Sequence, residues 1–291
     1  MNYRHHFHAG NFADVLKHAL LIELVRALQR KEKGFLYLDT HAGRGAYDLS
    51  TATMGDSSAR RPEWPDGIGR LLGRTDLPAG LLRYVATVGG FDARKRGGIA
   101  PVGAMSFYPG SPSIVREIAR VQDRLIFCER HPEECSALRD EFQFSPGTQV
   151  READGYATVR AVLPPIERRA LILIDPPFEA KDEFRQITRT LREGFRRFPA
   201  GVFAVWYPLT ERAGIDDFIA EIVSLRPPPT LVIELLIAGA ETSMKMKGCG
   251  VVIVNPPWQF QPEAAAMVAC LSETLAQGVG GGGRLTWLGS E

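Results

Sequence analysis

The sequence predicts an α/β protein with a doubly wound, mostly parallel sheet. Short apolar runs stop at polar or glycine-rich turns, and segments with helical spacing lie between these runs along most of the chain. Strands and helices that alternate in this way are typical of a parallel sheet with helices on both faces. The chain has 291 residues, 45% of them hydrophobic and 24% charged, which is enough for one large globular domain or two smaller ones.

The first predicted element is a helix that begins at Asn11. Apolar residues recur at near-helical spacing from Val15 to Leu28. Asn11 is a favoured N-cap residue, and Asp14 stands three residues later, close to a capping-box arrangement. Gly34 follows a short basic stretch, and we expect it to end this segment as a C-cap.

The predicted strands share an apolar run that closes on a turn or on a carboxylate. They are the segments 35–39, 125–131, 148–155, 170–178, 201–208, 230–237 and 250–258. The helices expected after the first one cover about 112–122, 132–143, 180–198, 211–224 and 262–276. The segment 148–155 is the weakest of the strands, and 170–178 is the strongest, because five apolar residues precede its Asp-Pro-Pro turn.

One region interrupts this alternation and predicts an insertion. Residues 50–107 contain prolines, glycines and scattered basic residues, with no convincing strand and only short helical pieces at about 66–73 and 78–88. We therefore divide the chain into a sheet domain formed by residues 1–49 and 108–291, with an N-terminal arm at 1–10, and an inserted helical subdomain at 50–107. The glycine-rich stretch 278–283 is expected to be a flexible connection.

The cysteines and the net charge indicate the cellular location of the protein and how it would bind nucleic acid. The four cysteines form no CxxC pair, so we expect reduced thiols and a cytoplasmic location. The N-terminus lacks the pattern of a signal peptide, and the apolar run after it carries charges, so no membrane association is expected. The net charge of +1 implies that any nucleic acid binds a local basic patch.

Five of the six histidines lie within the first 41 residues. No spacing of acids or cysteines supports a metal centre there, so we predict no bound metal. A basic and aromatic arm that contacts nucleotide and phosphate is the favoured interpretation, and a frayed terminus is the alternative.

The ends of the predicted strands supply candidate ligand-binding residues. In an open parallel sheet, ligands bind at the carboxyl ends of the strands, near the point where the strand order reverses. The glycine-rich loop 39–45, Glu129 and the pair Asp154–Gly155 all occupy such ends. Each has an ordinary alternative: a tight turn for the loop, a surface acid at a helix start for Glu129, and a common Asp-Gly turn for Asp154.

The sequence Asp-Pro-Pro-Phe at 175–178 carries the strongest chemical signal. The exocyclic nitrogen of adenine is a poor nucleophile, and it needs acceptors for its N–H groups before it attacks a sulfonium methyl group. Asp175 can supply one acceptor and the carbonyl of Pro176 another, which Pro176 and Pro177 hold rigidly because proline fixes φ. Phe178 can stack on an unstacked base. This pattern indicates methyl transfer from S-adenosyl-L-methionine to an adenine amine.

A second sequence fits the same pattern. Asn-Pro-Pro-Trp at 255–258 also follows an apolar strand. We prefer Asp175 because it follows the fourth predicted strand, where this chemistry belongs in the sheet, whereas Asn255 follows the last one. We interpret the second sequence as a strand terminator with a core tryptophan.

These motifs together resemble one family. The segments 3–18, 36–47, 108–112, 129–132, 153–155, 171–178 and 254–258 are similar, in order, to the bacterial 23S ribosomal RNA adenine-N6 methyltransferase J family. The resemblance runs along essentially the whole chain, and the N-terminal motif is highly distinctive. It implies a Rossmann-like methyltransferase sheet with a small helical insertion and the activity of enzyme class 2.1.1.

The resemblance also implies roles for individual residues. The residues expected to contact S-adenosyl-L-methionine are His18, His41, Ser111, Glu129, Asp154, Gly155 and Asp175. Asp175 would also be the catalytic proton acceptor, and Tyr3, His5 and Lys17 would lie on the substrate side with Pro176, Pro177 and Phe178. The family usually has tyrosine where this chain has Phe178, so stacking is retained but a phenol hydrogen bond is lost. Slower transfer or altered positioning is expected.

The expected partner is 23S ribosomal RNA, bound by a monomer. Methylation of adenine in DNA is the first alternative, although only the insertion is available as a recognition domain. A non-catalytic RNA-binding module is the second, and the intact Asp175 and glycine loop argue against it. The arm and the clusters Arg94–Lys95–Arg96 and Arg196–Arg197 are the candidate RNA contacts, with solvated surface as the alternative interpretation of both clusters.

Overall fold

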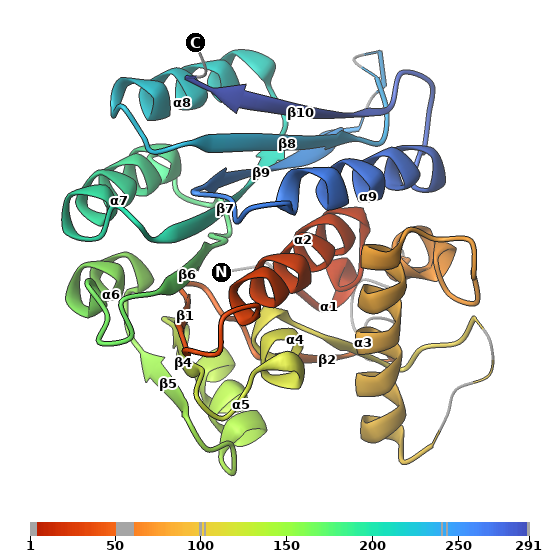
Figure 1. Ribbon diagram of the computed structural model, residues 1–291. Helices are drawn as coiled ribbons and strands as arrows, with labels where there is room; N and C mark the ends of the chain where they lie inside the picture. Colours follow the sequence, from red (N-terminus) through yellow and green to blue (C-terminus); the bar gives the residue numbers. More distant parts are fainter. Residues whose placement is uncertain are drawn as a thin grey trace.

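In the computed structural model, eight strands of the described residues form one sheet in the order β10-β8-β9-β7-β6-β1-β4-β5 (Figure 1). The structure describes residues 5–50, 61–98, 101, 103–239, 241–242 and 244–289, and only the backbone of residues 5 and 6. The strands are β1 (Leu36–Asp39), β4 (Arg124–Glu129), β5 (Thr148–Glu152), β6 (Ala170–Ile174), β7 (Val202–Leu209), β8 (Thr230–Leu236), β9 (Gly248–Val254) and β10 (Gly282–Leu288).

The strand directions place the functional end of the sheet. Strand β1 pairs in parallel with both β4 and β6, and β5 and β7 extend these parallel pairs outward. Strand β9 is antiparallel to β7 and β8, and β10 is antiparallel to β8. The α/β class with a mostly parallel, doubly wound sheet is therefore confirmed. The strand order reverses between β1 and β6, so ligands are expected at the carboxyl ends of these two strands.

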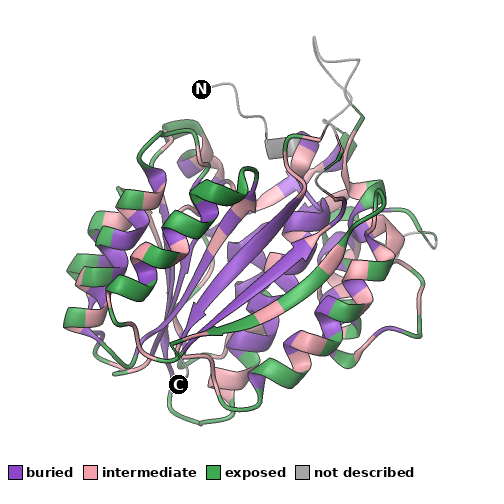
Figure 2. Cartoon of the chain, turned by 90° about the horizontal axis from the view of Figure 1, so that it is seen from above, coloured by how far each residue is buried: buried purple, intermediate pink, exposed green. Residues whose placement is uncertain are grey.

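Helices cover both faces of this sheet (Figure 1). Alternate residues of a strand face opposite sides, so Tyr37 packs into one core cluster while Leu36 and Leu38 pack into the other. The first cluster receives side chains from α2 (Phe12–Gln29), α3 (Ala79–Arg96), α4 (Ser111–Ile118), α5 (Pro132–Phe142) and α9 (Phe260–Thr274). The second receives them from α6 (Gly155–Val162), α7 (Glu183–Arg197) and α8 (Arg212–Ser224). Figure 2 shows the buried strands between these layers.

Helix α2 begins where the sequence predicts. The Asn11 side chain accepts hydrogen bonds from the backbone N–H groups of Ala13 and Asp14, both at 3.0 Å. The helix ends at Gln29, however, so Gly34 is not its C-cap. Gly34 is required for another reason: a Cβ atom there would lie 1.9 Å from the carbonyl oxygen of Gln122. Among the described helices, none is long and apolar enough to cross a membrane.

Within the described residues, most of the regular structure between β1 and β4 is helical. Strands β2 (Ala46–Asp48) and β3 (Phe107–Pro109) pair in a small antiparallel sheet where the chain enters and leaves it. Two 3-10 turns, η2 (Trp64–Asp66) and η3 (Ile68–Arg70), precede α3, which continues beyond the expected helical piece at 78–88. Helix α3 packs against α2 of the sheet domain. The boundaries of the inserted subdomain stay a prediction.

Helix α6 and strand β10 are among the elements that the sequence analysis missed. Helix α6 directly follows Asp154, where a strand end was expected, and β10 begins inside the glycine-rich stretch. The prediction of a flexible connection at 278–283 is therefore wrong for Gly282 and Gly283. A Cβ atom at Gly283 would lie 2.2 Å from Val268 Cγ1, so this glycine allows β10 to pack closely against α9.

The second Asp/Asn-Pro-Pro sequence lies at the other end of the sheet. Because β9 is antiparallel to its neighbours, its last residue Val254 pairs with Phe203 at the beginning of β7. Asn255 donates two hydrogen bonds through Nδ2, to the carbonyl oxygens of Pro199 at 2.7 Å and Gly201 at 2.8 Å. It thus terminates the strand, as expected. Trp258 is 79% exposed, so the expectation of a core tryptophan is wrong.

We predict that Asn255→Ala lowers the free energy of unfolding by about 1–3 kcal/mol, because it removes both hydrogen bonds. Alanine is also disfavoured at the positive φ of 51° that Asn255 adopts. Urea unfolding measures the loss. Binding of S-adenosyl-L-methionine to the folded variant should be unchanged, and a variant that loses this binding while remaining folded contradicts the structural role.

Candidate functional site

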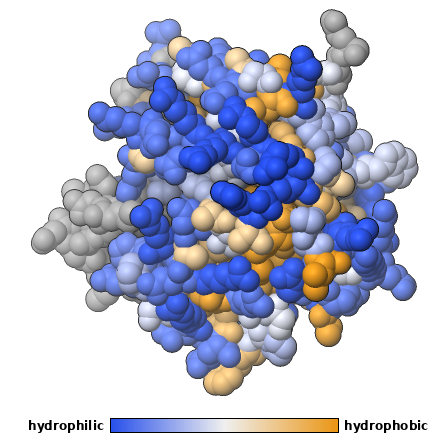
Figure 3. All heavy atoms as spheres, turned by 90° about the vertical axis from the view of Figure 1, so that its left-hand side faces the viewer, coloured by the Kyte–Doolittle hydropathy of each residue, from blue (hydrophilic) through white to orange (hydrophobic). Residues whose placement is uncertain are grey.

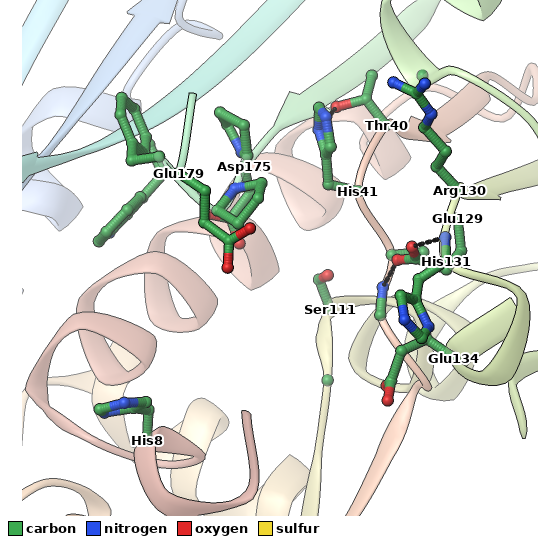
Figure 4. Close-up of a pocket in the computed structure, with 18 of the residues that line it drawn as sticks. His8, Thr40, His41, Ser111, Glu129, Arg130, His131, Glu134, Asp175 and Glu179 are labelled. Atoms are coloured by element: carbon green, nitrogen blue, oxygen red, sulfur yellow. Dashed lines mark hydrogen bonds between the residues drawn. The ribbon is translucent and has the colours of Figure 1, made fainter. Parts of the chain in front are cut away.

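A cavity of about 1210 Å³ opens at the carboxyl ends of β1, β4, β5 and β6 (Figure 4). Its lining includes eleven of the residues that the sequence analysis singled out: Lys17, His18, His41, Ser111, Glu129, Asp154, Gly155, Asp175, Pro176, Pro177 and Phe178. Tyr3 and the side chain of His5 lie outside the described residues. Residues from distant parts of the chain therefore share one site, as the strand-end argument predicts.

Glu129 is held in place by two backbone N–H groups. Gly43 donates to its Oε2 at 2.8 Å, and His131 donates to its Oε1 at 2.7 Å, as the dashed lines in Figure 4 show. Gly43 has a φ of 60°, so the glycine loop can bend its backbone toward the carboxylate. The carboxylate is thereby fixed at the edge of the cavity, where it can accept hydrogen bonds from ribose hydroxyl groups.

Asp154 and Gly155 begin helix α6 beside β1. The Asp154 Oδ1 atom caps the helix by accepting from the N–H of Ala157 at 3.0 Å. A Cβ atom at Gly155 would lie 2.0 Å from the carbonyl oxygen of Thr40, so only glycine fits here. The Asp-Gly pair thus begins a helix and lines the cavity. No described residue donates a hydrogen bond to Asp154 Oδ2, so this atom is available to a ligand amine.

Asp175 forms an ion pair that links β6 to α2. Lys17 Nζ lies 2.6 Å from Asp175 Oδ2 and 2.8 Å from Asp14 Oδ1. Burial opposes the charge of Lys17, but the two carboxylates raise its pKa well above the usual value. Burial likewise opposes the charge of Asp14, and Lys17 and His18 nevertheless lower its pKa to about 2. The lysine is therefore a fixed cation that orients Asp175.

His18 presents a buried nitrogen that has no hydrogen-bond partner among the described residues and lies 3.9 Å from Asp14 Oδ1. Its Nδ1 atom lies 2.7 Å from Tyr108 Oη, which in turn lies 2.9 Å from Tyr84 Oη. Its Nε2 atom is buried and makes no hydrogen bond within the described protein. Burial lowers the pKa of His18 to about 3, so the ring is neutral. An unsatisfied buried polar atom is costly, and a polar cofactor group in the adjoining cavity would satisfy it.

His41 is also neutral and has a defined tautomer. Thr40 Oγ1 donates to the carbonyl oxygen of Leu173 at 3.0 Å, so it accepts from His41 Nδ1 at 2.8 Å. Burial lowers the pKa of His41 to about 4. Its ring packs edge-on against Tyr156, with 4.9 Å between the ring centroids. Nε2 is therefore left as a hydrogen-bond acceptor.

The buried carboxylate of Asp39 lies behind Ser111. Ser111 Oγ donates to Asp39 Oδ2 at 2.6 Å, and Tyr37 Oη donates to the same atom at 2.9 Å. Burial raises the pKa of Asp39 to about 6, although both hydrogen bonds act in the opposite direction. The sequence analysis noted Asp39 as a strand end but did not assign it to the site. The structure shows that it orients Ser111.

Tyr156 and Glu183 are site residues that the sequence analysis missed. Tyr156 Oη donates to Glu183 Oε1 at 2.6 Å, and Glu183 is only 6% exposed. Both side chains line the cavity. They connect the start of α6 to the end of the loop that carries Asp175. No sequence motif identified these two residues. Helix α6, which carries Tyr156, was not predicted, and an acid such as Glu183 is common at the start of a helix.

Phe178 faces the cavity from an uncommon backbone conformation. Its φ is 51°, which a bulky residue rarely adopts. Its ring packs against Phe184 and Trp206, with centroid distances of 5.2 Å and 5.7 Å. Pro176 is buried beside it, and Pro177 is exposed. The surrounding aromatic rings thus hold the strained residue in position.

Carboxylates outnumber cations in the lining of the cavity. Eight acids line it, namely Asp14, Glu129, Glu133, Glu134, Asp154, Asp175, Glu179 and Glu183, against the cations Lys17, Arg44 and Arg130. Arg44 is moreover paired with Glu134 at 2.6 Å. Within the described residues, no cluster of His, Cys, Asp and Glu side chains has a metal-binding arrangement. The cavity suits a ligand that carries positive charge.

The strand order, the glycine loop, the acids at the ends of β4 and β5 and the Asp-Pro-Pro-Phe sequence after β6 define a class I S-adenosylmethionine-dependent methyltransferase. Residues 32–289 match the family described as "Ribosomal RNA large subunit methyltransferase D, RlmJ". The chain belongs to this RlmJ family.

Similar proteins cover the whole chain. The "Ribosomal RNA large subunit methyltransferase J" of Escherichia coli strain K12 is 37% identical over 288 residues, which is 99% of both chains. Its namesake from Haemophilus influenzae Rd is 37% identical over 296 residues and covers both chains completely. The crystal structure of protein LPL1258 from Legionella pneumophila has a TM-score of 0.82 and 33% identity, with 96% of this chain and 97% of that chain covered.

We predict that His41→Asn makes stability less sensitive to acid. The pKa of His41 is about 4 in the folded protein, below its ordinary value of 6.5. The unfolded chain therefore binds the extra proton, and stability present above pH 6.5 is lost as the pH falls toward 4.

Urea unfolding of both proteins between pH 6.5 and pH 4 provides the test. The free energy of unfolding should fall less steeply in the variant. His18 contributes equally to both proteins and cancels in their difference. Equal slopes would show that His41 does not stay neutral on folding.

Proposed function

We propose that this protein transfers the methyl group of S-adenosyl-L-methionine to the N6 amine of a specific adenine in 23S ribosomal RNA. The observation that carries the proposal is the position of Asp175 and Pro176, which lie at the end of β6 in the same cavity as Glu129, Asp154 and His18. The family to which the chain belongs and the names of its relatives support ribosomal RNA as the substrate.

The cavity offers matching groups to each part of the cofactor. Glu129 accepts hydrogen bonds from the ribose hydroxyl groups, and Asp154 accepts a hydrogen bond from the adenine amine of the cofactor. His18, His41 and Ser111 contact the remaining polar groups, and His18 Nε2, which has no hydrogen-bond partner among the described residues, accepts or donates one of these bonds. When bound, the cofactor supplies an electrophilic methyl group on a cationic sulfur. The surplus of carboxylates in the lining stabilises that positive charge.

Asp175 and Pro176 bind the target amine. Lys17 occupies Asp175 Oδ2, so Oδ1 has no partner among the described residues and can accept one amine N–H. The Pro176 carbonyl accepts the other, and Phe178 stacks on the base. These bonds orient the nitrogen lone pair toward the methyl carbon. As the C–N bond forms, the C–S bond breaks, and Asp175 accepts the proton that the amine releases before passing it to water.

One chain supplies Glu129, Asp154 and Asp175 to the same cavity, so we propose that the protein acts as a monomer. A cytoplasmic location follows from its RNA substrate and from the buried, unpaired cysteines Cys128, Cys135 and Cys249. Tyr3 and His5 of the arm belong on the substrate side of the cavity in this proposal, as does Lys17.

The decisive experiment combines radiolabelled S-adenosyl-L-methionine with unmodified large-subunit RNA and, in parallel, with DNA. Digestion to nucleosides identifies the labelled product. Label in N6-methyladenosine from the RNA is expected. Label in DNA alone would favour the DNA alternative, and no label in either would contradict the enzymatic proposal.

In the same assay we predict that Asp175→Ala lowers the single-turnover rate by at least about 10²-fold, because it removes the amine acceptor and proton acceptor together. Asn255→Ala is the matched control at the second Asp/Asn-Pro-Pro sequence and should transfer at the wild-type rate. Gel-shift measurements should show RNA binding in both variants. Wild-type transfer by Asp175→Ala would remove Asp175 from the reaction.

We further predict that Phe178→Tyr raises the rate of methyl transfer by about two- to fivefold, which corresponds to one additional hydrogen bond of about 0.5–1 kcal/mol. Phe184→Tyr adds the same hydroxyl group to a neighbouring ring that does not line the cavity, and it should leave the rate unchanged. A rate for Phe178→Tyr at or below that of the wild type would show that stacking alone is needed here.

A further inference from the structure

Helix α7 carries a row of arginines that begins beside the cavity. Arg185, Arg189, Arg192 and Arg196 are all exposed. Their spacing of four, three and four residues places them within an arc of about 60° and along about 16 Å of the helix. The opposite side of α7 packs Ile187 and Leu191 into the core. The sequence analysis singled out only the pair Arg196–Arg197 and missed this row.

The row is connected to the substrate side of the cavity. Helix α7 begins directly after the loop that carries Asp175 and Phe178, and Glu183 and Gln186 in its first turn line the cavity. Lys181, exposed in that loop, stands four residues before Arg185 and continues the row toward the cavity. The face of the molecule that carries α6, α7 and α8 is largely covered by hydrophilic side chains (Figure 3).

Several other arginines of this protein lie in ion pairs, whereas most cations of the row do not within the described part of the chain. Arg74 pairs with Asp76, Arg94 with Glu117, and Arg212 with Asp216. Lys95 and Arg96 of the other candidate cluster also face carboxylates, those of Glu141 and Asp92. No ion pair of Arg185, Arg189 or Arg192 is found among the described residues, and in the row only Arg196 has one, with Glu193 at 2.9 Å.

An exposed helix face whose charges serve only solubility usually carries both acids and bases, at spacings of three and four residues. From Lys181 to Arg196 the acids are Asp182, Glu183 and Glu193, and Glu183 is buried. Five cations in line with one exposed acid, Asp182, and one half-buried acid, Glu193, create a positive strip on a protein whose net charge is only +1. Such a strip is complementary to a chain of phosphates.

We infer that the strip formed by Lys181, Arg185, Arg189, Arg192 and Arg196 binds the phosphate backbone of the substrate RNA and leads the strand to the cavity. This inference rests on the proposed function. The cavity itself is rich in carboxylates and repels phosphates. The backbone that flanks the target adenine therefore lies outside the cavity, and the strip is a surface beside the cavity that attracts it. Phosphate contacts position the RNA, while the cavity selects the base.

The test is the triple variant Arg185→Gln, Arg189→Gln and Arg192→Gln. Glutamine keeps a long side chain and good helix propensity, so α7 should fold normally. The matched control is Arg26→Gln, Lys31→Gln and Lys33→Gln, three exposed cations in the last turn of α2 and in the loop that follows it, and α2 lies on the other face of the sheet. Each triple changes the net charge from +1 to −2, because three cations become neutral.

RNA affinity is measured against salt concentration for the wild type and both triples, and methyl transfer is measured on the same RNA. We expect the α7 triple to bind at least about tenfold more weakly and to lower the salt slope by about 2 to 3. KM for RNA should rise with it. The rate at saturating RNA and the affinity for S-adenosyl-L-methionine should match the wild type, and the control triple should change little.

Equal losses in both triples would show a general effect of net charge and overturn the strip. If the α7 triple variant keeps the RNA affinity and the salt slope of the wild type, the proposed role of the strip is also wrong. This holds even if the wild type methylates RNA. Conversely, RNA binding that depends on the strip without any methyl transfer would support the strip and contradict the proposed function.

Discussion

Strand β1 pairs in parallel on both sides, with β4 and with β6, and the whole site depends on this position. The chain builds β4 and β5 on one side of β1 and the remaining strands on the other. Parallel pairing brings the ends of these strands to one edge, so Glu129 and Asp175 line one cavity although they lie far apart in the sequence. Helix α6 joins the same edge so closely that a Cβ atom at Gly155 would lie 2.0 Å from the carbonyl oxygen of Thr40.

The electrostatic arrangement separates two opposite tasks. Inside the cavity, carboxylates face the position of a cationic cofactor, where the low dielectric strengthens their effect. Lys17 lies between Asp14 and Asp175 and reduces the electrostatic repulsion between their carboxylates. The arginines of α7 lie outside, where solvent screens them and a polyanionic substrate can reach them. A cation and a polyanion can thus be bound side by side.

Much of the sheet could be predicted, because buried parallel strands are short apolar runs that end in recognisable turns. Strand β6 and the N-cap of α2 are confirmed examples. Helix α6 was missed because it has only eight residues and its first turn reads as an Asp-Gly turn. Strand β10 was missed because Gly282 and Gly283 argue against a strand, whereas the lack of a side chain at Gly283 lets this strand pack against α9.

The sequence by itself determined the fold class, the family and the identity of most residues around the cavity, because these are encoded in local periodicity and in short motifs. The tertiary structure decided which of the two Asp/Asn-Pro-Pro sequences lies at the site, since β9 runs antiparallel and carries Asn255 to the opposite edge. It also placed Lys17 against Asp175 and left His18 Nε2 without a hydrogen bond from any described residue. Strand direction and contacts between distant residues arise from packing of the whole chain, which no local pattern specifies.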